Sequence, residues 1–274
     1  MKDALWTASP EGDLDPEMVV NLRKWFLAYV RTFECEDQQI QEGITFKKKH
    51  SIRVVNEIRR IGQQLNLSER DLRLAEVVAI LHDVGRFEQY ARYRTFSDTH
   101  SVNHAQLGAR IIRESGAIRQ WPDSLQDLVV HAVLHHSLAE LPSNGARAPV
   151  FFSKLLRDAD KLDILKLVTR YILPARDGRK RGFESSLPDT LGISEQVQDD
   201  LSQQRIVAVE HVKNLNDLIL FRLGWVYDIN FHPTFRRIKE KRYFEVIRGC
   251  LPNSPEIDEI FRSIRSFIGK RLSE

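Results

Sequence analysis

The composition of the chain is that of a globular protein. It has 274 residues, of which 42% are hydrophobic and 29% are charged, and its formal net charge at pH 7 is +3. These values exclude fibrous and disordered proteins, and the small net charge argues against a nucleic-acid partner. No segment holds about 18 uninterrupted apolar residues and the N-terminal segment lacks a secretion-signal pattern, so we expect a cytoplasmic protein without a membrane partner.

The two cysteines, Cys35 and Cys250, lie far apart and form no CxxC motif. Neither a disulfide framework nor a thiolate zinc site is therefore indicated. We expect both to be free thiols buried in the core.

Three amphipathic helices are expected in the first third of the chain. Asp15-Pro16 supplies a cap and a proline at the first helical position of a helix whose apolar pattern extends to Phe33. In the second helix His50 shares a face with apolar residues that recur at steps of three and four. The third helix is capped by Ser68 and places His82 on its inward stripe.

The segment from 85 to 101 is polar and aromatic, and we expect a loop or short helices that cover the end of the third helix. Helices are then expected from Asn103 to Gly116, from Asp123 onward and from 151 to 171. The last of these is followed by a basic loop, Pro174–Gly182.

The C-terminal part predicts three more helices, near 194–224, 234–249 and 255–272. We find no period-two strand pattern and no internal repeat. The predicted fold is all-α, a multi-helix bundle that forms one domain over residues 1–274, with the C-terminal helices (194–272) packed on the rest.

Polar residues that interrupt the apolar stripes come from several of these helices. They are His50, His82, Asp83, His104, a histidine of the 131–136 cluster, and Asp160. A single buried histidine is more often a hydrogen-bonded core residue, and a single aspartate is more often a cap. The joint pattern instead favours a metal site, because such sites in helical proteins are built from side chains of facing helices.

Two positions require a choice between neighbouring residues. At about 100° per residue, His136 lies near the middle of the apolar stripe of its helix, His135 lies at the edge and His131 lies further out. We choose His136 as the ligand, with His135 second. The same test favours Asp160 over Asp158, because Asp160 continues the inward stripe in steps of four.

The order of these residues resembles the HD-domain superfamily of metal-dependent phosphohydrolases. The family pattern is a lone His, an adjacent His-Asp pair and a distant Asp, and here these are His50, His82-Asp83 and Asp160. The last lies in Leu156–Asp163, which resembles the closing motif of the family. The resemblance covers about residues 44–170 and implies a helical bundle of the HD-domain type.

Two further histidines match members of this superfamily that bind two metals. His104 and His136 lie between the His-Asp pair and the last Asp, where those members have additional histidines. The chain departs from the HD-GYP subgroup, because Ser137 stands where that subgroup has Glu and no Gly-Tyr-Pro follows. We therefore do not expect cleavage of cyclic dinucleotides.

The resemblance implies one or two divalent ions, chosen among Fe, Mn, Ni, Co and Mg. The four pattern residues would hold one ion, and His104 and His136 would hold a second that Asp83 bridges to the first. A metal-bound hydroxide would then attack the phosphorus of a nucleotide or another small phosphoester.

Cations and polar groups near the pattern are candidates for phosphate binding. We predict catalytic roles for Asp83, Arg86 and Lys161, and substrate binding by Arg86, Gln89, Tyr90 and Lys161. A surface salt bridge is the plainer interpretation of either cation. Asp98 is a candidate proton relay or a turn cap.

Two basic runs, Lys47–Lys49 and Arg176–Arg181, complete the charged features of the sequence. We expect solvated faces, and the alternative is attraction of phosphate or of a nucleic-acid end.

Two other function classes remain open: a di-iron oxygenase with the same ligands, and a ligand-binding or regulatory module that holds metal structurally. The predicted partner is a small phosphorylated molecule of the nucleotide type, and the oligomeric state is left open.

Overall fold

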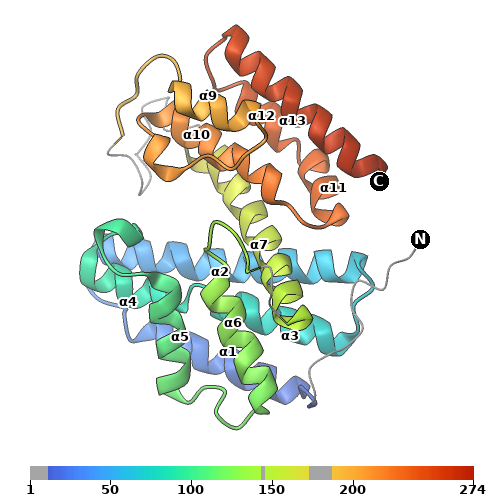
Figure 1. Ribbon diagram of the computed structural model, residues 1–274. Helices are drawn as coiled ribbons and strands as arrows, with labels where there is room; N and C mark the ends of the chain where they lie inside the picture. The colour runs from blue at the N-terminus through green and yellow to red at the C-terminus, as the bar shows by residue number, and fades with distance from the viewer. Residues whose placement is uncertain (1–11, 143–145, 173–186) are drawn as a thin grey trace. The chain divides into compact units, whose positions relative to one another are not determined.

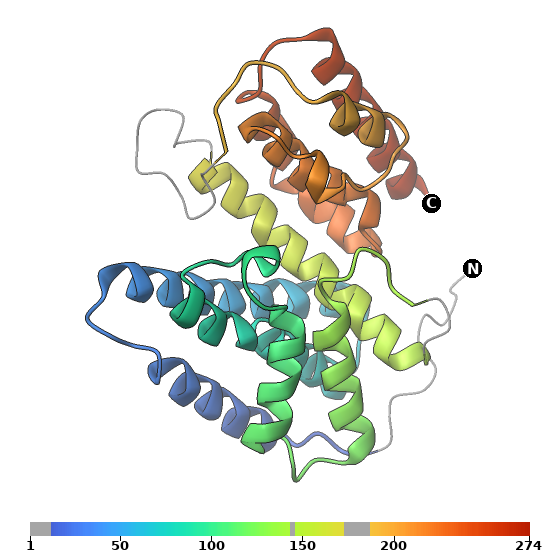
Figure 2. The same cartoon turned by 60° about the vertical axis from the view of Figure 1, so that its left-hand side comes forward.

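The structure is a computed structural model that describes residues 12–142, 146–172 and 187–274. These residues form helices and no strand, so the predicted all-α class is confirmed (Figures 1 and 2). The predicted basic loop Pro174–Gly182, which contains the basic run Arg176–Arg181, lies outside the described residues. Within the described ranges, no helix is long and apolar enough to cross a membrane.

The chain divides into two compact units at a point inside one helix. Unit 1 ends at Asp160 and unit 2 begins at Lys161, and both residues belong to helix α7, Arg147–Leu167. One domain can contain two such units, so the expectation of a single domain stays a prediction.

Unit 1 is built from helices α1 to α6 and the first part of α7 (Figure 1). Their bounds are Pro16–Arg31 (α1), Gln38–Gln64 (α2), Glu69–Leu81 (α3), Val84–Tyr93 (α4), His104–Ser115 (α5) and Asp123–His135 (α6), with a short 3₁₀ helix at Asp98–His100. Helix α2 packs along α3 and α4, and α5 lies beside α6 (Figure 2). The segment after the His-Asp pair is thus formed by short helices, one of the two predicted alternatives.

The helix boundaries follow from local capping chemistry. At Asp15, Ser68 and Asn103 a side-chain oxygen accepts a backbone N–H two or three residues further on, which satisfies a donor that the helix leaves unpaired. Gly116 ends α5 with φ 68°, the left-handed conformation that glycine adopts without strain. The predicted starts and this end are confirmed.

Helix α3 lies at the centre of unit 1. Every residue from Leu74 to Leu81 is buried, including Glu76, whose carboxylate pairs with Arg23 and Arg59 from α1 and α2. A helix that is buried all round needs apolar neighbours on every side. The sequence predicted only an inward stripe for this helix, whereas α1, α2 and α6 enclose it.

Helices α4 and α5 meet at an unusually close contact. A Cβ atom added to Gly85 would collide with the backbone carbonyl of His104 and would lie 2.7 Å from the backbone nitrogen of Gly108. Only glycine lets the two backbones approach this far. The contact therefore fixes the distance between the start of α4 and the start of α5.

Unit 2 contains shorter helices than the sequence predicted. Its elements are a π-helical turn Val168–Ile172 after α7, then α9 (Glu195–Ser202), a 3₁₀ turn Val209–His211, α10 (Leu215–Gly224), a 3₁₀ turn Trp225–Asp228, α11 (His232–Glu240), α12 (Tyr243–Arg248) and α13 (Pro255–Ser273). The predicted helix over 194–224 is wrong, since a loop separates α9 from α10. The predicted helix over 234–249 is also wrong, because Arg242 takes a left-handed conformation with φ 52° and ends the helical run.

Asp217 organises the loop that enters α10. Its side chain is 0% exposed. It accepts hydrogen bonds from the backbone N–H and the hydroxyl of Ser194, at 2.8 and 2.6 Å, and from the backbone N–H of Lys213 at 3.0 Å. These neutral donors compensate the burial of the carboxylate.

The cysteines differ from the sequence expectation in burial. Both are free, but Cys35 is exposed and Cys250 is half-buried, so the predicted burial is wrong. Cys35 follows α1 in a charged stretch that has no apolar face to pack.

Candidate metal centre

The pair His82-Asp83 occupies the junction of two helices. Helix α3 ends at Leu81 and α4 begins at Val84. His82 is 0% exposed and Asp83 is 3% exposed. A carboxylate at this depth costs free energy unless charged or hydrogen-bonding partners compensate it. The partners of Asp83 therefore decide what the junction can do.

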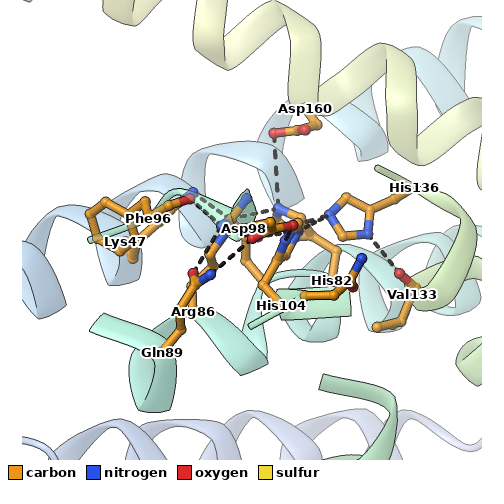
Figure 3. A network of polar contacts seen from close by, with 12 residues as sticks. Lys47, His82, Arg86, Gln89, Phe96, Asp98, His104, Val133, His136 and Asp160 are labelled. Carbon is orange, nitrogen blue, oxygen red and sulfur yellow. Dashed lines mark hydrogen bonds and ion pairs between the residues drawn. The ribbon is translucent and has the colours of Figure 1, made fainter. Parts of the chain in front are cut away.

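The first group of partners faces one oxygen of Asp83. The Nε2 atoms of His50, from α2, and of His82 each lie 3.4 Å from Oδ2 of Asp83. Asp160, from α7, places its Oδ1 3.0 Å from Nε2 of His50 and 3.9 Å from Nε2 of His82 (Figure 3). This group brings together residues that are as far apart as α2 and α7 in the sequence.

The second group faces the other oxygen. Oδ1 of Asp83 lies 3.6 Å from Nε2 of His104, at the start of α5, and 3.9 Å from Nε2 of His136, at the end of α6. The two Nε2 atoms lie 3.1 Å apart. In each group of two histidines and Asp83, the ligand atoms lie within 4.8 Å of one another. One carboxylate thus joins two pairs of imidazoles, with one oxygen toward each pair.

The hydrogen bonds of the outer ring nitrogens fix where the imidazole protons lie. Nδ1 of His82 donates to the backbone carbonyl of Ala79 at 2.8 Å. Nδ1 of His136 donates to that of Val133 at 2.7 Å (Figure 3). Nδ1 of His104 donates to Oδ2 of Asp98 at 2.6 Å. Because these oxygens can only accept, each Nδ1 bears a proton. In the neutral ring Nε2 then has a lone pair, and it points toward Asp83.

The electrostatics of the centre favour the neutral forms of His104 and His136 and the charged form of Asp83. Burial, aided by the neighbouring imidazoles, lowers the pKa of His136 to about 3. Burial and Arg86 also lower the pKa of His104. Burial alone would raise the pKa of Asp83, but Lys47, His82 and Arg86 outweigh it and hold this pKa well below its usual range. Facing lone pairs and an ionised carboxylate form a strong acceptor cluster at neutral pH.

The family model of the HD domain matches residues 48–165, a range that includes both groups around Asp83. The chain contains an HD domain. The resemblance seen in the sequence is therefore confirmed, while the exclusion of the HD-GYP subgroup stays a prediction. Searches of curated proteins and of solved structures found no match. The HD superfamily consists mostly of metal-dependent phosphohydrolases, and its domains bind divalent metals.

The donor set of this HD domain fits a divalent metal ion. Lone pairs on His104 and His136, 3.1 Å apart, repel each other unless a cation or a proton lies between them. Imidazole nitrogen and carboxylate oxygen are ligands for Fe, Mn, Co and Ni. The Nδ1 hydrogen bonds orient the rings as they do around bound metals. The structure therefore brings six of the predicted ligands together: His50, His82, Asp83, His104, His136 and Asp160.

The segment after the HD pair supports this cluster from one side. Asp98 accepts from Nη1 of Arg86 at 2.7 Å and from the amide of Gln89 at 2.9 Å, and it binds His104 as described. Burial would raise the pKa of Asp98, but His104 and Arg86 lower it to about 2. Gln89 also donates to the backbone carbonyl of Val102 at 2.8 Å. Asp98 thus orients a histidine of the candidate metal centre, a role that the sequence analysis did not assign.

A second residue that sequence reasoning missed is Arg157. It is 4% exposed, and its guanidinium donates to the carbonyls of His135 and His136, at 3.4 and 3.2 Å, and to those of Leu138 and Ala139. These carbonyls belong to the last residue of α6 and to the turn that follows it, where the helical hydrogen-bond ladder ends. Arg157 lies three residues before Asp160 on α7, so it ties the helix end that bears one candidate ligand to the helix that bears another. A buried arginine inside an apolar stripe was the available signal.

A third missed residue is Lys47, which the sequence analysis placed in a solvated basic run. Its Nζ lies 2.6 Å from Oδ2 of Asp83 and 5.4 Å from the centre of the Phe96 ring. The available signal was its position three residues before His50, which places both on one face of α2.

Three predicted residues have other surroundings. The ammonium of Lys161 pairs with Asp228. Tyr90 is 2% exposed and stacks on Phe96 with ring centres 4.3 Å apart. His135 contacts His131, with ring centres 3.7 Å apart, and belongs to neither group around Asp83. Roles for Lys161 and Tyr90 in substrate binding, and for His135 as a ligand, stay predictions.

Proposed function

We propose that this HD domain is a metal-dependent phosphohydrolase that acts on a nucleotide or another small phosphoester. The observation that supports the proposal is the sharing of Asp83 between two pairs of histidines whose Nε2 atoms face its two oxygens. An ionised carboxylate and four imidazoles in this arrangement suit one or two divalent ions of the Fe, Mn, Ni, Co or Mg type. When bound, such an ion supplies a Lewis acid for phosphoryl oxygens and an activated water as nucleophile.

The residues of the chain have separable tasks in this proposal. His50, His82, Asp83 and Asp160 would hold one ion, and His104, His136 and Asp83 would hold a second. The hydrogen bonds to Nδ1 of His82, His104 and His136 keep these three rings in the orientation and tautomer in which Nε2 bears a lone pair.

Arg86 supplies positive charge beside the carboxylate. Its Nε lies 3.5 Å from Oδ1 of Asp83, while its Nη1 is held by Asp98, by Gln89 and by the carbonyl of Phe96. A guanidinium fixed in this way can bind a phosphoryl oxygen without further ordering. Gln89 contributes by holding the segment that holds Arg86.

The test is hydrolysis by protein freed of metal and then loaded separately with Mn²⁺, Fe²⁺, Co²⁺, Ni²⁺ or Mg²⁺. A panel of nucleoside monophosphates, diphosphates, cyclic nucleotides and p-nitrophenyl phosphate is assayed for release of phosphate or nucleoside. We expect turnover with at least one metal and one substrate class. We expect Asp83→Asn to lower the rate by at least about a thousandfold, more than the loss of one stabilising donor usually costs.

Asp127→Asn is the matched control, because Asp127 is an exposed aspartate on α6. It should keep both metal content and rate. Absence of turnover over the whole panel in metal-loaded protein, or equal rates for Asp83→Asn and wild type, would refute the proposal.

A further inference from the structure

Two cations approach the shared carboxylate from different helices. Nζ of Lys47, on α2, lies 2.6 Å from Oδ2 of Asp83, and Nε of Arg86, on α4, lies 3.5 Å from Oδ1. Their side chains are only 13% and 15% exposed. Phe96 is placed against both, since its ring faces Nζ of Lys47 and its carbonyl accepts from Arg86 (Figure 3).

Lys47 and Arg86 have more hydrogen-bond donors than the described residues offer acceptors for. An ammonium has three donors, and Asp83 is the acceptor that Lys47 reaches. Nε of Arg86 is buried and makes no hydrogen bond to any described residue. A buried donor without an acceptor costs free energy, so both groups favour an additional acceptor at this place.

The carboxylate cannot serve Lys47 and a metal ion equally well. Oδ2 of Asp83, the partner of Lys47, is the same oxygen that faces His50 and His82. If that oxygen is used as a ligand, a largely buried ammonium needs another anion close by. One divalent ion also turns the net charge of Asp83, Asp98, Asp160, Lys47 and Arg86 positive, which favours an anionic ligand.

We propose that Lys47 binds the substrate phosphate and, together with Nε of Arg86, selects phosphomonoesters over phosphodiesters. The inference rests on the proposed function and names its substrate class. A terminal phosphate has three non-bridging oxygens, enough to accept from Lys47, to accept from Arg86 and to bind the metal side of the site. A diester has two, so one of these three partners is left without an oxygen.

Phosphate binding tests the subsite without any need for turnover. Mn²⁺-loaded protein is titrated calorimetrically with inorganic phosphate, with methylphosphonate, which has three non-bridging oxygens, and with dimethyl phosphate, which has two. Metal content is measured on the same samples. We expect wild type to bind the first two probes at least about tenfold more tightly than dimethyl phosphate.

The decisive variant is Lys47→Met, and Lys49→Met is its matched control. Lys49 lies two residues away on α2 and is exposed, so its substitution removes the same charge from the same helix. We expect Lys47→Met to weaken phosphate binding by about 10- to 100-fold with unchanged metal content, and Lys49→Met to leave both unchanged. Lys47→Arg should recover most of the binding, and Lys47→Gln replaces Lys47→Met if the latter does not fold.

Three outcomes would overturn the proposal: equal phosphate affinity of the Lys47 and Lys49 variants, loss of metal from Lys47→Met, or equal affinity of wild type for all three probes. Loss of metal would mean that Lys47 acts through Asp83 and not on substrate. Lys47-dependent phosphate binding in a protein that shows no hydrolysis would support the subsite and refute only the proposed function. Hydrolysis with phosphate binding that does not depend on Lys47 would refute only the subsite.

Discussion

Two buried aspartates, one in each unit, show how differently a folded chain can treat the same side chain. Asp217 in unit 2 accepts from the backbone and hydroxyl groups of residues that are close in space to its own helix start, and these donors satisfy it. Asp83 in unit 1 faces four imidazole nitrogens, three of which have their ring proton on the far side. Asp217 is a structural cap. Asp83 instead faces imidazole nitrogens that bear lone pairs, so both it and these partners are electron-pair donors. A cation placed between these donors would remove their repulsion, and for this reason Asp83 marks a candidate site and Asp217 does not.

The largest expected effect concerns the satisfied carboxylate. Asp217→Ala leaves two backbone N–H groups and one hydroxyl without their acceptor inside the fold. We expect it to lower the free energy of unfolding by about 3 kcal/mol, with metal binding unchanged. Chemical denaturation measures this, with Asp199→Ala, an exposed aspartate on α9, as control. A loss no larger than that of the control would show that the cap contributes little.

The next effect is stabilisation of the fold by metal, which should require Asp83 but not Asp217. A divalent ion present at about 100 times its dissociation constant should stabilise the folded protein by about 2.7 kcal/mol, because it binds only the assembled site. We expect this stabilisation in wild type and in Asp217→Ala, and its absence in Asp83→Asn. Thermal unfolding with and without a chelator measures it. Stabilisation of Asp83→Asn to the wild-type extent would place the metal elsewhere.

A smaller effect is expected from the support of the second histidine pair. Arg157→Met removes the guanidinium that holds the carbonyls of His135 and His136. Partners that orient metal ligands typically change metal affinity by about 10- to 100-fold, and we expect a loss in this range. Metal titration measures it, with Arg119→Met as a surface control. If two ions bind, only the one held by His104 and His136 should weaken; an equal weakening of both would point to general destabilisation.

The smallest effect is a pH dependence in unit 2. Asp200 is largely buried, which would raise its pKa, but Arg205 and His211 lower the pKa below the usual value. A carboxyl whose pKa is lower in the folded state stabilises the fold above its unfolded pKa, and this contribution is lost as the pH falls through the folded pKa. We expect Asp200→Asn to lower the free energy of unfolding by less than about 1 kcal/mol at pH 6 and to leave it unchanged near pH 2. An equal effect at both pH values would contradict the assignment.

The elements of unit 1 could be predicted because their signals are local. Caps such as Ser68 and Asn103 act on residues three positions away, and the helical repeat placed His50 on a buried face and selected Asp160, which lies beside it. The break at Arg242 could not be predicted, because a left-handed arginine leaves no mark in the apolar pattern.

The supporting residues of the site lay beyond local reasoning. Lys47 and Asp83 are separated by 36 positions, and Arg157 and His136 by 21. Charged residues in these places look the same in a sequence whether they are solvated or paired in the interior. Only the packing of α2 and α7 against the junction of α3 and α4 distinguishes the two cases.

The close contact at Gly85 has a consequence for how this chain can change. The glycine lies two positions after Asp83, and the backbone that it touches belongs to His104, so one missing side chain sets the spacing between the two ligand-bearing segments. A library of all substitutions at position 85 should yield only glycine among folded proteins, while position 49 should accept most residues. Sequence changes in the segment after α4 can therefore alter what the site binds, whereas position 85, which sets the spacing between the two segments with candidate ligands, has to remain glycine.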